Sequence, residues 1–196
     1  SIISAAELAG VKRIVFASSA AVYGDCETVP IPEDAPLIPQ SPYAVSKIVG
    51  EELMKRSEIS TCSLRFFNVY GPGQSSEGGY AAVIPAFKKA IEIGKECKIF
   101  GNGTQVRDFI HVEDLVRIIS LSLESKNLPS EMNIASGIGT SLLDLIEILR
   151  KLNPEMLSPI FEDERAGDIH TSVADISRLL STLPMVELTS IKEGLS

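Results

Sequence analysis

Short apolar, β-branched runs alternate with helix-like stretches along this 196-residue chain, and this alternation limits the possible folds most strongly. The first apolar run covers residues 11–16 and gives way to small residues, and comparable runs lie at 61–71 and 107–112. Between them, residues 42–57 and 80–94 carry apolar side chains at helical spacing. Strands that alternate with helices form a mostly parallel sheet covered by helices. We therefore predict an α/β fold, with the run at 11–16 as a strand buried on both faces.

The chain opens within a helical pattern and continues the alternation to its carboxyl end. Residues 2–8 carry apolar side chains near helical spacing, and Gly10 fits the position just after a helix end. Because Ser1 falls inside this pattern, we expect the sequence to be a fragment of a longer protein. Pro42 suits the first turn of the next helix. Further strands are predicted at 97–101, 131–136 and 159–163, and further helices at 113–124, 140–152 and 175–183.

The charge of the chain excludes several classes of partner. The net charge is −8, and no run of lysine or arginine interrupts the acidic character. Such a protein has no general attraction to nucleic acid or to an anionic membrane. Its apolar runs are too short to span a bilayer. The three cysteines, Cys26, Cys62 and Cys97, lack metal-ligand spacing, so we predict free thiols in a cytoplasmic protein and no metal site.

Tyr43 and Lys47 lie four residues apart in the second predicted helix and so share one helix face. A phenol ionises near pH 10, but a neighbouring ammonium group favours the phenolate, which suits such a pair to general-base chemistry. Ser19 ends the preceding strand, at the carboxyl edge of the sheet where open α/β folds bind ligands. Together these side chains could remove a proton from a hydroxyl group while hydride leaves its carbon. The alternative is an ordinary surface pair on a helix.

Five motifs in a fixed order resemble those of one enzyme family: SSAAVYG, SPYAVSK, LRFFNVYGPGQ, IFGNGTQVRDFIHVEDLV and RAGDIHTSVADISR. They are similar to those of the extended short-chain dehydrogenase/reductase family, the NAD-dependent sugar-nucleotide epimerases and dehydratases, and most similar to the UDP-hexose 4-epimerases. The family's amino-terminal glycine-rich loop is not found in the sequence. The resemblance implies the rear part of a Rossmann-like, doubly wound parallel sheet (residues 1–78, with 105–136 returning to it). It also implies a smaller α/β sugar-nucleotide-binding domain (79–104 and 137–196).

The resemblance implies NAD as the cofactor and a UDP-sugar as the substrate, and it gives roles to residues of these motifs. Tyr43 is the catalytic base, and Lys47 holds the nicotinamide ribose and tunes Tyr43. Ser19 hydrogen-bonds the substrate hydroxyl. Ser18 is expected near the cofactor, and it is the rival for the role of Ser19 if the register differs by one residue. Phe67 lies beside the nicotinamide.

The same resemblance implies a binding site for the nucleotide part of the substrate. Asn68, Arg107 and Arg165 bind the diphosphate, a task to which guanidinium groups are suited. The remaining assignments are Asp168 to a ribose hydroxyl, and Val83 and Phe100 to the uridine site.

Other interpretations of neighbouring residues stay open. Arg107 and Asp108 could form a local ion pair instead. His111 is predicted to be structural, His170 to be a solvated loop residue, and Phe66 to lie in the core.

The two alanines after Ser19 distinguish among the reactions of the family. Dehydratases of the family carry acidic residues where this chain has Ala20 and Ala21, and decarboxylating relatives tend to keep a glutamate there. Alanine cannot move protons, so the resemblance favours 4-epimerisation of a UDP-hexose through a transient 4-keto sugar, with NAD regenerated and tightly bound. The small side chain of Ser172, at a position that faces the sugar, favours acceptance of UDP-GlcNAc and UDP-GalNAc as well as UDP-Glc and UDP-Gal. The GGYAAVIP motif points the same way.

Two other functions remain as alternatives: another family member, such as a UDP-uronate 4-epimerase or a 4-keto-sugar reductase, and a non-catalytic module that binds nucleotide sugars weakly. The resemblance also implies a homodimer, in which the helix bearing Tyr43 and the helix ending at Gly10 form a four-helix bundle with their partners. The outward face of that first helix is expected to carry Glu51, Lys55 and Arg56, which leaves a solvated face as the alternative. The sheet is expected to have one uncovered edge.

Overall fold

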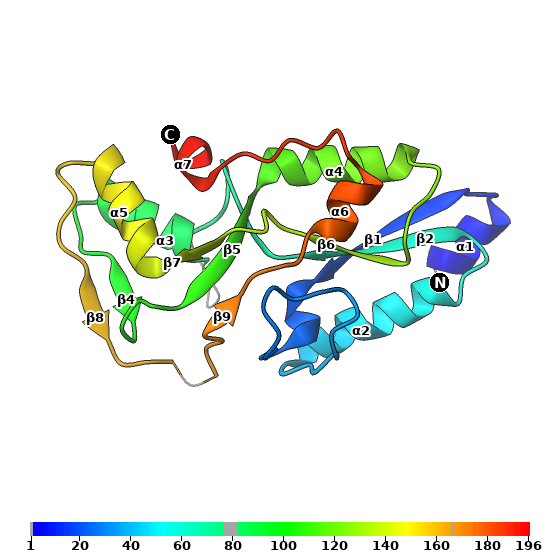
Figure 1. Ribbon diagram of the computed structural model, residues 1–196, viewed down its shortest axis with the longest axis horizontal. Coiled ribbons are helices and arrows are strands. Elements are labelled where there is room, and N and C mark those ends of the chain that lie inside the picture. The colour runs from blue at the N-terminus through cyan, green and yellow to red at the C-terminus, as the bar shows by residue number, and fades with distance from the viewer. Residues whose placement is uncertain (1, 77–81, 166) are drawn as a thin grey trace.

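The computed structural model describes residues 2–76, 82–165 and 167–196, and its first sheet consists of three parallel strands (Figure 1). These are β1 (Arg13–Ser19), β2 (Ser60–Phe66) and β6 (Glu131–Ile134), in the order β1-β2-β6. Helix α2 (Pro42–Lys55) covers one face, and α4 (Val112–Glu124) and α6 (Ser177–Thr182) lie over the other (Figure 1). Helices on both faces of a parallel sheet are the doubly wound arrangement, so the predicted α/β class is confirmed.

A second sheet begins where the sequence suggested one continuous strand over 61–71. The chain leaves the first sheet after Phe66, and β3 (Asn68–Tyr70) pairs instead with β5 (Val106–His111). The single-strand prediction is therefore wrong. At the break, the backbone N–H of Phe67 still donates to Ile134, while the Asn68 side chain donates to the main chain of β5. The change of sheet brings Ser19 and Asn68 to the two sides of one opening.

The strand β5 is the centre of the second sheet. It pairs in parallel with β3 and with β9 (Thr171–Ser172), and antiparallel with β7 (Gly139–Ser141). The strands β7 and β9 have three and two residues, too few to show a periodic pattern, and the sequence analysis missed both.

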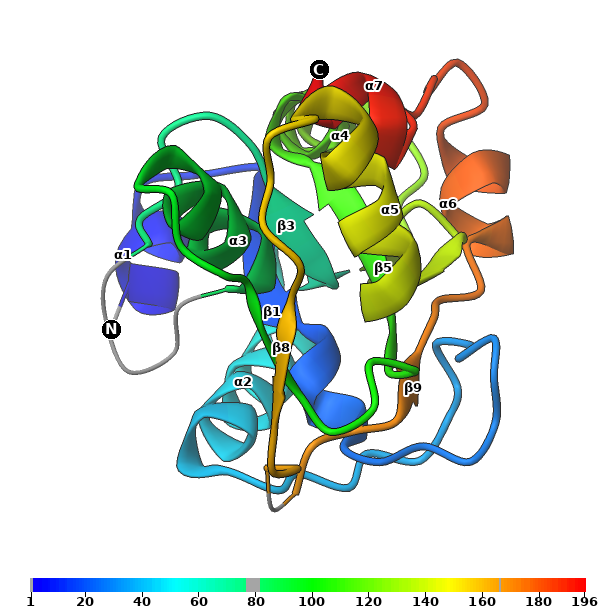
Figure 2. The same ribbon diagram turned by 90° about the vertical axis from the view of Figure 1, so that its left-hand side faces the viewer.

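A third unit, beside the two sheets, lies at the left-hand end of the molecule in Figure 1 and faces the viewer in Figure 2. It contains α3 (Val83–Glu92), α5 (Leu142–Leu152) and the parallel pair β4 (Lys98–Phe100) and β8 (Ile160–Glu162). The short helix α7 (Ile191–Leu195), which was not predicted, closes the same core. The helix predicted from residue 80 is present from Val83, with Ala82 just before it. Residues 80 and 81 and the loop at 77–79 lie outside the described residues.

Helix ends follow the signals in the sequence. Ser41 caps α2, its side chain accepting from the N–H of Ala44, and Pro42 occupies the first turn. Ser141 and Asp144 form a capping box at the start of α5. The first helix, α1 (Ile2–Leu8), is followed by Gly10 with φ of 69°, the left-handed conformation that glycine adopts without strain.

Two expectations about burial need correction. Strand β1 is not buried on both faces: Arg13 to Phe16 are only partly buried, because in the described part of the chain β1 pairs with β2 alone. Glu51 does not face outward on α2; it is 1% exposed and points toward the sheet. The expectation is thus wrong for Glu51 but right for Lys55 and Arg56, which are exposed. The exposed positions of that helix also include Val45, Val49 and Leu53.

The predicted division into two domains remains a prediction. Three groups of buried side chains lie beside β2 and β6, around α3 and α5, and under the loop that follows β1. Leu179, Leu183 and Val186 pack with β2 and β6, so the α6 region is joined in packing to the predicted dinucleotide-binding part. No described helix is long and apolar enough to cross a membrane.

Candidate active site

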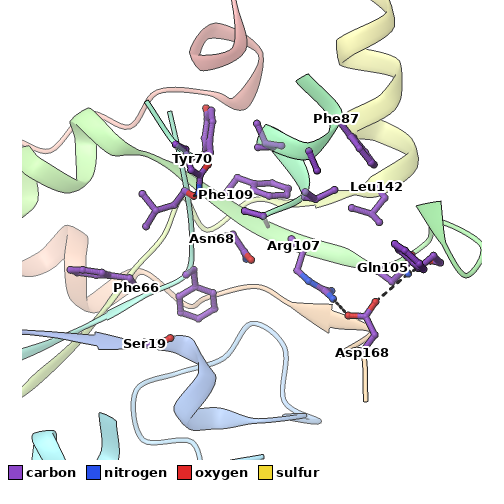
Figure 3. Close-up of a pocket in the computed structure, with 18 of the residues that line it drawn as sticks. Ser19, Phe66, Asn68, Tyr70, Phe87, Gln105, Arg107, Phe109, Leu142 and Asp168 are labelled. Atoms are coloured by element: carbon purple, nitrogen blue, oxygen red, sulfur yellow. Dashed lines mark hydrogen bonds and ion pairs between the residues drawn. The ribbon is translucent and has the colours of Figure 1, made fainter. Parts of the chain in front are cut away.

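A cavity of about 680 Å³ lies at the carboxyl ends of β1 and β2 and extends toward α3 and β5 (Figure 3). This size is ordinary for a site that takes a small-molecule ligand. Residues from all three units line it, and they include ten of the twelve predicted site residues: Ser18, Ser19, Tyr43, Phe67, Asn68, Val83, Phe100, Arg107, Arg165 and Asp168. The other two, Lys47 and Ser172, lie beside it.

Tyr43 lies in the first turn of α2, at the mouth of the cavity. Its side chain is 55% exposed, and the Lys47 ammonium group lies 5.4 Å from the centre of its ring. Lys47 donates a 2.8 Å hydrogen bond from Nζ to the carbonyl oxygen of Ala17 and lies 5.3 Å from the Phe16 ring. One of its three N–H groups is used in this way, and the lysine is fixed to strand β1 next to the two serines.

The two serines at the end of β1 have different environments. Ser19 caps the short 3₁₀ helix Ala20–Tyr23, and its Oγ accepts from the N–H of Ala21 at 3.2 Å. That bond occupies a lone pair and not the hydroxyl proton. Ser18 is 2% exposed, and its hydroxyl donates to Oε1 of Glu51 at 2.5 Å. The Ser19 hydroxyl is therefore the better placed of the two to donate to a ligand.

Arg107 and Asp168, both in the cavity lining, form an ion pair of 2.6 Å (Figure 3). The Arg107 side chain also donates to the carbonyl of Val106. Its alternative partner, Asp108, is fully buried and accepts hydrogen bonds from Ser136, Gly137 and Ala174. Burial raises the pKa of Asp108, and these hydrogen bonds oppose that rise. The interpretation of Arg107 and Asp108 as a local ion pair is thus wrong, because adjacent strand residues face opposite sides.

The far end of the cavity is aromatic and cationic. The Arg165 guanidinium group lies 3.7 Å from the centre of the Phe100 ring, a cation–π contact, and Val83 lines the wall nearby. Asn68 donates through Nδ2 to the carbonyl of Asp108 at 3.0 Å, which fixes its amide in the opening between the sheets.

A smaller cavity of about 290 Å³ adjoins the first. Its lining includes Ser19, Ala20, Ala21 and Ser172 together with Asp168. Ser172 belongs to β9 and is paired in register with Arg107. Ala20, Ala21 and Ser172 thus bring small side chains to this part of the lining, and the methyl groups of the two alanines cannot transfer protons.

Several residues that line the cavity were not predicted from the sequence. Gln105 donates from Nε2 to the carbonyl of Phe100 and to Asp168, and it lies within a motif that was recognised, so its position could have been noted. Tyr70 and Phe109 were missed because apolar strand residues do not reveal which of them face a cavity. Phe66, predicted to be in the core, is partly buried, packs against the first group of core residues and also lines the cavity.

The two histidines lie outside the cavity lining. His111 is buried, and its ring centre lies 5.3 Å from that of Tyr70, which agrees with a structural role. His170 is exposed, with Nε2 3.3 Å from the hydroxyl of Thr104. Within 2–76, 82–165 and 167–196, no group of three or more His, Cys, Asp or Glu side chains could hold a metal ion.

Comparison with known proteins gives the family. Residues 1–135 match the sequence model of the NAD dependent epimerase/dehydratase family. The UDP-glucose 4-epimerase of Bacillus subtilis (strain 168) is 35% identical over 193 residues, covering 87% of this chain and 57% of that protein. The chain therefore spans less than two thirds of the length of this relative.

Solved structures agree. The UDP-N-acetylglucosamine 4-epimerase from Methanobrevibacter ruminantium M1, in complex with UDP-N-acetylmuramic acid, superposes with a TM-score of 0.93 at 35% identity, over 99% of this chain and 64% of that one. The UDP-glucose 4-epimerase from Thermotoga maritima gives a TM-score of 0.91 at 31% identity, with the same coverage. The resemblance inferred from the five motifs is confirmed: the chain belongs to the NAD-dependent epimerase/dehydratase family and has its Rossmann-like α/β fold.

Proposed function

We propose that this protein interconverts the 4-epimers of a UDP-hexose through a transient 4-keto sugar, with NAD as a tightly bound cofactor. One observation carries the proposal. Tyr43, with Lys47 beside it, and Ser19 converge on one cavity, and Ala20 and Ala21, directly after Ser19, bring methyl groups to the adjoining smaller cavity. Such a site can exchange a hydroxyl proton, but it lacks the carboxyl groups that dehydration or decarboxylation would need there.

The donor set at the mouth of the cavity fits a nicotinamide ribose. Lys47 uses one N–H on Ala17 and has two left for ribose hydroxyls. Phe67 and Ser18 line the same cavity as Tyr43, and the Phe67 ring would give an apolar surface for a nicotinamide ring. When bound, NAD supplies the reversible hydride acceptance at C4 that this reaction requires.

The residues of the chain then handle the proton. Tyr43 accepts the proton of the sugar 4-hydroxyl. Ser19 keeps its own proton and donates a hydrogen bond to the same sugar oxygen, which holds that oxygen in place. After the keto sugar has turned over in the cavity, Tyr43 returns the proton to the oxygen on the opposite configuration. No net oxidation results, so the reaction needs no external reductant.

The rest of the cavity is suited to a nucleoside diphosphate. Arg107 and Arg165 bring two guanidinium groups to it, and Asn68 adds an amide, which together match the charge and acceptors of a diphosphate. Asp168, already paired with Arg107, would also accept from a ribose hydroxyl. The wall formed by Val83 and Phe100 would hold the uracil base.

Ser172 supports acceptance of N-acetylated sugars, because it borders the smaller cavity next to Ala20 and Ala21. A tyrosine at this position would fill that space. We therefore expect Ser172→Tyr to lower the rate on UDP-GalNAc relative to the rate on UDP-Gal, with wild type accepting both. Equal rate ratios in wild type and variant would remove the basis for this specificity.

A homodimer and a cytoplasmic location belong to the same proposal. The exposed side chains of Val45, Val49 and Leu53 repeat every four residues on α2, and Ile2 and Leu8 are exposed on α1. An apolar stripe of this kind is typical of a helix that packs against another. Free Cys26, Cys62 and Cys97 accord with a reducing compartment.

The test uses the protein at its full natural length with NAD bound. UDP-Gal, UDP-GalNAc and UDP-glucuronate are incubated separately without reductant, and C4 inversion is followed by NMR. Inversion of the hexoses supports the proposal, and inversion of the uronate alone would replace it with a uronate epimerase. Stoichiometric consumption of NADPH with a 4-keto sugar would indicate a reductase. Binding of UDP-sugar with no turnover of any kind would favour a non-catalytic module.

A further inference from the structure

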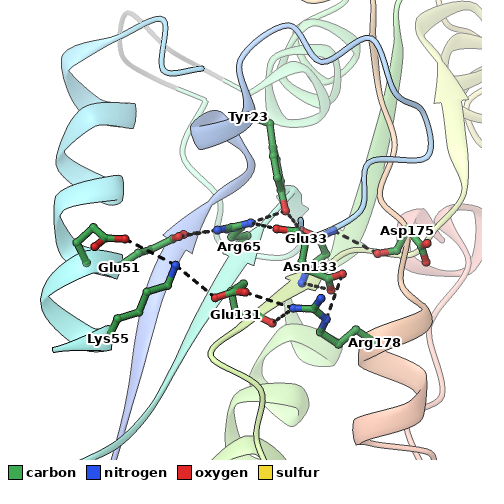
Figure 4. Close-up of polar contacts among 10 residues, drawn as sticks. Tyr23, Glu33, Glu51, Lys55, Arg65, Glu131, Asn133, Asp175 and Arg178 are labelled. Atoms are coloured by element: carbon green, nitrogen blue, oxygen red, sulfur yellow. Dashed lines mark hydrogen bonds and ion pairs between the residues drawn. The ribbon is translucent and has the colours of Figure 1, made fainter. Parts of the chain in front are cut away.

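A buried ion pair lies directly behind the candidate active site. Arg65 of β2 and Glu51 of α2 are 2% and 1% exposed. They make two parallel hydrogen bonds, from Nε to Oε1 at 2.9 Å and from Nη2 to Oε2 at 2.7 Å (Figure 4). This is the bidentate geometry in which arginine binds carboxylates most strongly. The mechanism described above uses neither residue.

The pair holds both ends of the segment that carries Ser19. At one end, the hydroxyl of Ser18 donates to Glu51 at 2.5 Å. At the other, Nη1 of Arg65 donates to the Tyr23 hydroxyl at 2.9 Å, and that hydroxyl donates to Asn133 at 2.6 Å. Burial raises the pKa of Tyr23 to about 12, so the phenol stays neutral and can serve in both bonds. The turn between these two points is the one that Ser19 caps.

The same pair fixes the helix that carries the base. Glu51 lies four residues after Lys47 and eight after Tyr43, so the three share one face of α2. The helix comes very close to β1 at Gly50, where a Cβ atom would lie 2.3 Å from the Phe16 ring. Bonds from Ser18 to Glu51 and from Lys47 to Ala17 then set the position of the helix along the strand.

A role in stability alone does not account for this arrangement. A buried ion pair is often no more stabilising than apolar residues of similar volume. Here three of its contacts, those with Ser18, Tyr23 and the carbonyl of Glu33, fix the segment after β1 and the loop that follows it. The neighbouring contacts of Lys55 with Glu131 are more exposed and lead away from the cavity.

We propose that the Glu51–Arg65 pair positions Ser19 against Tyr43 and Lys47, acting through Ser18, Tyr23 and the register of α2. The expected effect on kcat rests on the proposed function. The expected effect on the segment at residues 18–24 does not depend on it. The two residues are positioning residues and touch neither substrate nor cofactor.

The kinetic test compares variants of the full-length, NAD-loaded protein. The double change Glu51→Leu with Arg65→Met removes both charges and leaves no unpaired one. Because small misplacements of reacting groups are costly, we expect kcat to fall by about 10- to 100-fold, with KM for the UDP-sugar within about threefold. Glu51→Asp keeps the charge but shortens its reach, so we expect a smaller fall in kcat with KM unchanged. Lys55→Met, one turn further along α2, is the control and should leave both constants unchanged.

A second measurement separates this inference from the proposed activity. Amide hydrogen exchange should be faster in the double variant at residues 18–24, and unchanged at α5. Wild-type rates and wild-type exchange in a folded double variant would overturn the inference. If the double variant does not fold, the Glu51→Asp variant decides. Wild-type kcat and wild-type hydrogen exchange at residues 18–24 in that variant would then overturn the inference. If wild type proves inactive on every UDP-sugar, exchange alone decides: faster exchange at 18–24 supports positioning although the proposed activity fails, and unchanged exchange refutes it.

Discussion

Replacing Glu51 by glutamine should destabilise the chain far more than its small change in size suggests. The Glu51 carboxylate accepts two hydrogen bonds from Arg65 and one from Ser18. A glutamine has one acceptor oxygen and would turn N–H donors toward the Arg65 donors. Burial alone would lower the pKa of Arg65, but the bond to Glu51 and the contact with Tyr23 raise it above its ordinary value, so Arg65 stays charged. The variant would therefore hold an unpaired buried cation.

The expected loss in the free energy of unfolding follows from this unpaired charge. Removing one partner of a buried ion pair costs about 3–5 kcal/mol, a large part of the ~5–15 kcal/mol that stabilises a typical domain. The double change Glu51→Leu with Arg65→Met avoids the unpaired charge, and it loses the contacts with Ser18, Tyr23 and the Glu33 carbonyl at about 1 kcal/mol each. We expect it to be more stable than the glutamine variant.

Urea denaturation of the full chain at pH 7, followed by circular dichroism, measures these free energies of unfolding. Lys55→Met is the matched control, since the side chains of Lys55 and Glu131 are 38% and 18% exposed and such pairs contribute about 0–1 kcal/mol. A glutamine variant within 1 kcal/mol of this control would refute the reasoning, because Glu51 would then not neutralise Arg65.

Three further predictions concern pH, thiols and assembly. The pKa of Glu131 lies below its ordinary 4.5, since nearby hydroxyl and cationic groups outweigh the effect of burial. Its contribution to stability is therefore present above pH 4.5 and lost as the pH falls, so Glu131→Gln should have a lower urea midpoint than wild type at pH 7 and the same midpoint in strong acid. Burial raises the pKa of Cys62 to about 12 and also raises that of Cys97, so iodoacetamide at neutral pH should label Cys26 alone in the native chain, as mass spectrometry would show. Val49→Arg on the exposed face of α2 should turn the proposed dimer into a monomer in light scattering; a wild-type monomer would contradict the dimer.

Local signals predicted the helices well. Pro42 marked the first turn of α2 and Gly10 the end of α1, because helix ends are decided by adjacent residues. The change of sheet at Phe67 could not be read in the same way. Residues 61–71 have continuous strand character, and only the position of β5, far along the sequence, decides where Asn68 pairs.

In the candidate site too, local motifs predicted some features, and others depend on residues far apart in the sequence. Motifs gave the residue types of the cavity, including Tyr43 and Arg107, but not their pairings. Arg107 pairs with Asp168, 61 residues away, and not with its neighbour Asp108. Glu51 was expected on the surface because charged residues usually are. Its burial depends on Arg65 of another strand, which no local pattern reveals.

Inversion at C4 of UDP-galactose by the full-length, NAD-loaded protein, followed by NMR without added reductant, tests the proposed activity most directly. Wild type should produce UDP-glucose until the two epimers reach equilibrium. Tyr43→Phe, which keeps the ring and removes the group that accepts the proton, should bind the UDP-sugar with similar affinity and lose nearly all inversion. Inversion by Tyr43→Phe at the wild-type rate, or its absence from a folded, NAD-loaded wild type, would contradict the account.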